Sequence, residues 1–157
     1  MKNYTSQVSV EKTISLIERF LAKAGASNIL KNYDGGEISS ISFTLFDPVS
    51  RKTVFIKLPA RVGAVEKILY RKIKRPRNET IKRIREQAAR TAWKLMLDWI
   101  EVQLSLIEME QVEALQVFLP YIWDGQKTFY QALKENNFKA LPMERNDRGD
   151  GKEAEAR

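Results

Sequence analysis

The sequence of 157 residues contains no cysteine and no histidine. Without cysteine the chain has no disulfide framework, no thiol nucleophile and no thiolate metal site. The lack of histidine removes the commonest general base and the commonest zinc ligand. Catalytic arrangements that pair serine or cysteine with histidine are therefore excluded.

The sequence also lacks long apolar runs and a secretory signal. Its apolar stretches are interrupted by charges, so none is long enough to cross a bilayer. The N-terminal residues MKNYTSQVSVEKT have no apolar core of the kind that a signal peptide needs. We expect a protein of the host-cell cytoplasm with no membrane partner.

The composition suits one folded domain. The chain is 43% hydrophobic and 10% aromatic, which is enough to build a core in a domain of this length. We expect residues 1–141 to form a single α+β domain. Residues 142–157 are polar and rich in charge, so we predict a disordered tail there.

Hydrophobic periodicity predicts an N-terminal helix followed by a three-stranded antiparallel meander. The helix is capped by Ser9 and ends near Ala24, before Gly25. The strands span residues 28–33, 37–46 and 53–58, and Asp34-Gly35-Gly36 makes a tight turn between the first two. A short helix over residues 62–70 and short helices near the C-terminus, one over 128–136, complete the pattern.

One long amphipathic helix dominates the second half of the sequence. Asn78 is its predicted N-cap, and about 30 residues at ~1.5 Å each give a length of roughly 45 Å. Its apolar residues recur at steps of three and four, which predicts a continuous apolar seam of Ile81, Ile84, Ala88, Ala92, Leu95, Trp99, Val102 and Leu106. Met96, Ile100, Leu104 and Ile107 widen the apolar face toward the C-terminal half, so we expect that half to be buried on two sides and the basic half on one.

The net charge of +7 is distributed unevenly along the chain. From Arg51 to Lys94 there are fifteen Lys or Arg residues and three acids, whereas Leu95 to Asp124 holds six acids and no Lys or Arg. A basic block beside an acidic block favours an electrostatic binding surface. The alternative is a solubilising surface that happens to be uneven.

The basic block supplies the candidate binding residues. Cations in a loop reach phosphates without base selectivity. Cations at the start of a helix oppose its macrodipole, which suggests that they serve a partner. The alternative is neutralisation by neighbouring segments. The candidates are Arg71, Lys72, Lys74, Arg75 and Arg77 in the loop, and Lys82, Arg83, Arg85, Arg90 and Lys94 on the helix.

Aromatic residues add one further candidate. Trp93 lies off the predicted seam between Arg90 and Lys94, so it either stacks on a base or packs in the interior. Trp99 lies on the seam and is expected in the core. Phe55 is predicted on the outer face of its strand, where a helix could cover it.

Catalytic and metal motifs are absent from the pattern. Asp98, Glu101 and Glu108 share a helix face, and a solvated or ion-paired stripe explains them without a metal. Asp47 and Lys57 suggest a nuclease core, but Phe55 stands where the metal-binding carboxylate is needed. The Gly35-Gly36 pair lacks the rest of a phosphate loop. We predict no catalytic residue, no metal site and no cofactor.

Two resemblances set these observations in context. Residues 87–108, the Val117–Tyr121 segment and the strands around Ile41–Phe43 and Phe55–Pro59 resemble a family of small bacteriophage and mobile-element proteins. That resemblance covers most of residues 9–135 and implies a genomic setting, because the family has no established activity. The order helix–strand–strand–strand–helix is also similar to the double-stranded RNA-binding domain, although the extra short helix, the basic loop and the long last helix depart from it.

The sequence therefore predicts a non-enzymatic nucleic-acid-binding accessory protein of a phage or mobile element, with DNA and RNA both open. The alternative is a phage-encoded inhibitor or adaptor that docks on a host protein or nucleoprotein. A homodimer is also open, with Leu95–Asp124 of one chain facing Arg71–Lys94 of another. An enzyme is the third hypothesis.

Overall fold

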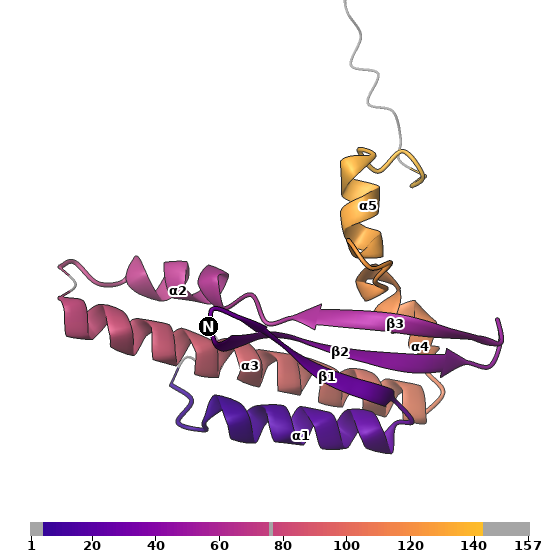
Figure 1. Cartoon of the computed structure of the whole chain (residues 1–157), viewed down its shortest axis with the longest axis horizontal. Helices are drawn as coiled ribbons and strands as arrows, with labels where there is room; N and C mark the ends of the chain where they lie inside the picture. Colours follow the sequence, from indigo (N-terminus) through magenta and orange to yellow (C-terminus); the bar gives the residue numbers. More distant parts are fainter. Residues whose placement is uncertain (1–4, 76, 143–157) are drawn as a thin grey trace, which may run out of the picture.

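The computed structural model describes residues 5–75 and 77–142 and has the predicted α+β class and element order. The predicted tail from residue 143 onward lies outside the described residues. The elements are α1 (Val10–Lys23), β1 (Ser27–Asp34), β2 (Glu37–Asp47), β3 (Lys52–Pro59), α2 (Val62–Tyr70), α3 (Asn78–Glu108), α4 (Ala114–Phe118), the 3₁₀ helix η1 (Leu119–Tyr121) and α5 (Phe129–Glu135) (Figure 1).

Local signals set the ends of α1 and the first turn of the sheet, as predicted. The Ser9 hydroxyl accepts a hydrogen bond of 3.3 Å from the backbone N–H of Lys12, which caps the helix. Gly35 and Gly36 join β1 to β2 with φ angles of 57° and 83°. Two successive positive φ angles define the tight hairpin turn that favours glycine.

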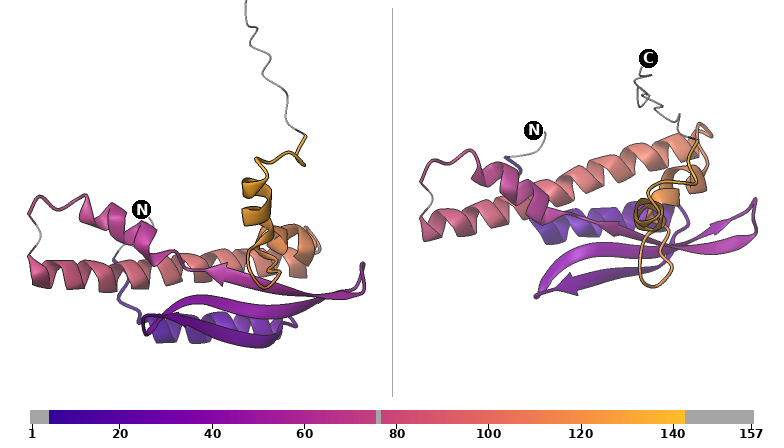
Figure 2. Two further views of the ribbon diagram at one scale, coloured as in Figure 1. Left: turned by 45° about the horizontal axis from the view of Figure 1, so that its top comes forward. Right: turned by 90° about the horizontal axis from the view of Figure 1, so that it is seen from above.

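The three strands form an antiparallel sheet in the order β1-β2-β3, and helices cover one of its faces. Helices α1 and α3 lie together on that face (Figure 2). The side chains between the helices and the sheet are fully or almost fully buried. They form one cluster, so the sheet, α1 and the second half of α3 share one core. Its largest members are Ile14, Ile17, Leu21, Ile41, Phe43, Ile56, Leu58, Trp93, Leu97, Ile100 and Phe118.

The buried face of α3 differs from the predicted seam. Ile84, Ala88 and Ala92 are buried as expected, but Ile81 is 38% exposed and Val102 is 56% exposed. Beyond Ala92 the deeply buried positions are instead Trp93, Leu97 and Ile100. The buried face turns because the first half of α3 packs on α2, whereas the second half packs on the sheet and α1.

A helical hairpin extends beyond the sheet and α1 at the left of Figure 1. It consists of α2, the loop after it and α3 up to Ala88, and we call it the arm. Helix α2 packs along α3 but has no fully buried residue, and Ile84 and Ala88 are the buried α3 residues in the described part of the arm. The N-cap of α3 is Arg77, one residue before the predicted Asn78.

The C-terminal elements lie at the other end of the sheet. The backbone N–H of Trp123 donates a hydrogen bond of 2.8 Å to the carbonyl of Phe55, which attaches this segment to the edge of β3. Helix α5 begins with a capping box at Thr128 and points away from the sheet (Figure 1).

Candidate nucleic-acid interface

The predicted basic loop forms the end of the arm. It connects α2 to α3, and the first turns of α3 continue the same charged surface. Residues 61–86 carry ten Lys or Arg residues and three acids. Eight of the ten predicted cations are exposed, namely Arg71, Lys72, Lys74, Arg75, Arg77, Lys82, Arg83 and Arg85.

Six of these side chains have no hydrogen bond or ion pair with any residue that the structure describes. Lys72 is not among them, because it does interact within the protein. The six charges therefore project into solvent from a protruding hairpin, and among the residues that the structure describes no carboxylate forms an ion pair with them. We call these six the tip cations: Arg71, Lys74, Arg75, Arg77, Lys82 and Arg83.

Arg85 has a different role, because it is paired with the sheet. Its Nη2 lies 3.1 Å from Oε2 of Glu37, at the start of β2, and both side chains are about 60% exposed. The hydrogen bond with Glu37 raises the pKa of Arg85 above its usual value, and the negative charges of Glu37 and Glu66 act in the same direction. This exposed pair links the base of the arm to the β1–β2 turn.

Arg90 and Lys94 are also engaged within the protein. Arg90 donates from Nε to the Ser6 carbonyl at 3.2 Å and from Nη2 to Gln87 Oε1 at 2.8 Å. Lys94 Nζ lies 2.9 Å from Oδ1 of Asp98. Both cations are half-buried. The alternative expectation, neutralisation by neighbouring segments, therefore holds for Lys94 and Arg85, whereas the two oxygens that accept these hydrogen bonds from Arg90 are uncharged.

Trp93 does not belong to the interface. Its side chain is 1% exposed and lies in the core with Leu97 and Ile100. The prediction that it stacks on a base is wrong, and the packing alternative is confirmed. Neither the predicted seam nor the wider apolar face predicted for the second half of α3 included Trp93, although the buried face does include it.

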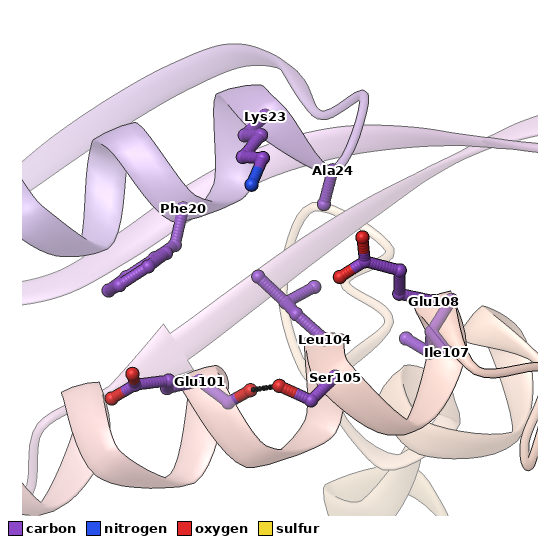
Figure 3. Close-up of a pocket in the computed structure, with 8 residues that line it drawn as sticks. All are labelled: Phe20, Lys23, Ala24, Glu101, Leu104, Ser105, Ile107 and Glu108. Carbon is purple, nitrogen blue, oxygen red and sulfur yellow. Dashed lines mark hydrogen bonds between the residues drawn. The ribbon is translucent and has the colours of Figure 1, made fainter.

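The acidic residues Glu101 and Glu108 lie toward the opposite end of α3, roughly 27 and 37 Å along the helix axis from the tip cation Arg83. There α1 and α3 enclose a groove of about 430 Å³ (Figure 3). Phe20, Leu104 and Ile107 supply apolar surface to it, Glu101 and Glu108 supply negative charge, and Lys23 supplies one positive charge. The two charged ends are too far apart to neutralise each other within one chain.

The described residues contain no group of three or more Asp or Glu side chains placed to hold a metal ion. Asp98 is the counter-ion of Lys94, and the Asp47 side chain accepts a hydrogen bond of 2.7 Å from the backbone N–H of Ser50. In the same part of the chain, no helix is both long and apolar enough to cross a membrane.

Sequence reasoning missed a groove on the outer side of α2. It is shallow and open to solvent, and it is lined by Gly63, Glu66, Lys67, Tyr70 and Arg71. These residues follow the spacing i, i+3, i+4, i+7 and i+8, which places them on one helical stripe. That spacing is visible in the sequence, but the sequence alone does not show which face of this helix is exposed.

Comparison with known proteins adds no relative. No protein-family model, curated protein or solved structure matches the chain. The resemblances to phage proteins and to double-stranded RNA-binding domains therefore stay predictions, and the exposed cations of the arm are the feature that bears on function.

Proposed function

We propose that the protein binds nucleic acid through the tip cations of the arm. One observation carries this proposal: six Lys and Arg side chains project from the end of a protruding hairpin without an acidic partner in the described residues. Gathering like charges on one tip costs electrostatic free energy in the isolated protein. A polyanion removes that cost and releases its own condensed counterions on binding.

The geometry of the arm fits phosphate contacts. The tip cations lie on a loop and on the first two turns of α3, so they present positive charge over a convex surface that a phosphate backbone can follow. The N-terminus of α3 is at the same place, and its macrodipole adds to the positive potential. These contacts are to the backbone, so we expect little sequence preference.

We propose binding rather than catalysis as the activity. The tip chemistry consists of permanent positive charges, which position phosphates but do not move protons at neutral pH. The resemblance to phage and mobile-element proteins makes an accessory role in such an element the setting that we propose, with DNA and RNA both as candidate ligands.

The test compares two variants of equal charge. In the tip variant Lys74, Arg75, Arg77 and Lys82 are replaced by Gln. In the control variant the exposed Arg19, Lys23, Arg51 and Lys52, all outside the arm, are replaced by Gln. Both variants have a net charge of about +3, so overall charge alone does not distinguish them. Binding to labelled DNA and RNA is measured by anisotropy at several salt concentrations.

We expect the tip variant to bind more weakly and with a shallower salt dependence, and the control variant to keep the affinity and the salt dependence of the wild type. Removing one cation that binds a phosphate makes the slope of log K against log salt shallower by about 0.7 to 0.9, so removing four changes it by about 3. Equal affinity and slope in the two variants would show that the tip is not the site. Circular dichroism melting confirms that both variants are folded.

A protein-directed inhibitor or adaptor is the second candidate function. The groove between α1 and α3 favours it, because apolar side chains flanked by charges of both signs, Glu101 and Glu108 with Lys23, suit a protein partner better than a phosphate backbone (Figure 3). In this case the wild type and the tip variant bind no nucleic acid, and Leu104→Arg abolishes binding to the partner. The proposed homodimer would use the same acidic end.

A further inference from the structure

We infer that Tyr70 is a stacking site for an unpaired base, so that the arm prefers single strands to duplex. The inference rests on the proposed function and names the form of nucleic acid that the arm takes. Three features of the groove on α2 support it: an exposed aromatic ring, open space in front of that ring and positive charge beside it.

The ring of Tyr70 is accessible. Its residue is 43% exposed although it lies at the end of α2, beside the basic loop. Long side chains on a helix lean toward its N-terminus, over the residues three and four positions earlier. For Tyr70 these are Glu66 and Lys67, which line the same groove.

Gly63 leaves the far end of the groove open. A Cβ built on Gly63 would meet nothing within 4 Å, so neither a neighbouring side chain nor the backbone occupies that space. The groove is shallow and open to solvent, so a base can reach the ring from outside. A larger residue at this position would extend into the space that a stacked base needs.

The charges around the groove match a nucleotide. Lys67 and Arg71 flank Tyr70 along the stripe, and the loop that continues from Arg71 carries Lys74 and Arg75. The carboxylate of Glu66 lies close enough to Arg85 to affect its pKa, so that charge is partly compensated within the arm. A strand whose phosphates contact the loop would therefore bring the next base to Tyr70.

An unpaired base is the occupant that this surface suits best. Bases in a duplex are stacked on each other and present edges rather than faces, whereas a base in a single strand offers its π-face to an aromatic side chain. Stacking of this kind tolerates any base, which agrees with phosphate contacts that do not select sequence.

The experiment measures anisotropy with a labelled oligothymidylate, an oligouridylate and a DNA duplex. We expect Tyr70→Ala to weaken binding to both single strands by about 5- to 100-fold and binding to the duplex by less than about twofold. Tyr70→Phe should retain the wild-type affinities, because the ring and not the hydroxyl stacks. Gly63→Leu should reproduce the loss by filling the groove.

Two matched controls exclude a general effect of removing an exposed apolar group. Ile68→Ala removes a side chain of 45% exposure from the same helix, and Tyr130→Ala removes a tyrosine of 45% exposure from α5. Both should bind as the wild type does. Thermal melting of Tyr70→Ala checks that the arm is intact.

The outcomes separate the inference from the function on which it rests. If Tyr70→Ala binds single strands like the wild type while the tip variant does not, the stacking site is wrong and the phosphate site stands. An equal loss for single strands and duplex would also overturn the stacking site. A wild type that binds none of the three ligands would overturn both proposals.

Discussion

The two halves of α3 belong to the same helix but have different surroundings. From Thr91 onward the helix lies between the sheet, α1 and the C-terminal elements, and Trp93, Leu97 and Ile100 are almost completely buried. Before Thr91 it packs on α2, with Ile84 and Ala88 as its buried residues in the described part of the arm. The charge changes with the surroundings, from basic in the arm to acidic beyond Lys94.

This difference separates stability from recognition within one element. Burial of large apolar side chains stabilises the fold in proportion to the area removed from water, and within α3 the most deeply buried large side chains, Trp93, Leu97 and Ile100, lie in the second half. The first half buries few side chains, so its exposed positions are under little constraint from packing. It is therefore the half in which unpaired charge is tolerated.

The largest expected effect follows from truncating the core of the second half. Trp93→Ala should lower the free energy of unfolding by about 3–5 kcal/mol, because the ring leaves a cavity in a packed interior. Urea denaturation followed by circular dichroism measures it. The control Val102→Ala, on the same half but 56% exposed, should change stability by less than about 0.5 kcal/mol. Comparable losses in the two variants would contradict the assignment of the buried face.

A smaller and local effect is expected from the arm. Ile84→Ala should destabilise the packing of α2 on α3 by about 2 kcal/mol while leaving the sheet intact. Hydrogen exchange should then show faster exchange for amides of α2 and of the start of α3, and unchanged exchange in β2. Equally faster amide exchange in the arm and in β2 would show that the arm and the sheet unfold as one unit.

The smallest expected effect is a loss of stability at low pH, and it should arise at the β2–β3 turn rather than in the arm. Hydrogen bonds from the side chain and then the backbone of Ser50 hold the pKa of Asp47 below its usual range. A lowered folded-state pKa means stability that is present above the unfolded pKa of about 3.9 and is lost as the pH falls through the folded value. Wild type should therefore melt higher than Asp47→Asn near neutral pH, and the difference should shrink below about pH 4. A constant difference at all pH values would show that ionisation of Asp47 does not matter.

Much of the fold was predictable because its signals are local. The cap at Ser9 and the two glycines of the hairpin each act within a few residues, so spacing alone reveals them. The environment of Trp93 was not predictable in this way. It depends on which elements pack against each side of α3. The helical repeat of apolar residues in the sequence does not contain this tertiary information.

The same limit applies to the candidate site. The basic loop is visible as a run of charges, but the partners of Arg85 and Arg90 include Glu37 and Ser6, which are distant in the sequence. Tyr70 was overlooked for a related reason. Whether an aromatic residue is exposed or buried depends on whether another element packs beside it, and the local sequence does not show this.

The continuity of α3 has a mechanical consequence. No break separates Asn78 from Glu108, so the arm and the packed interior share a single stiff axis. A tilt of roughly 10° about the region of Leu97 would displace the start of the helix, some 30 Å away, by roughly 5 Å. A small rearrangement beneath the sheet would thus produce a movement of the arm large enough to realign a bound ligand. Conversely, a force on the start of the helix would be transmitted to the core.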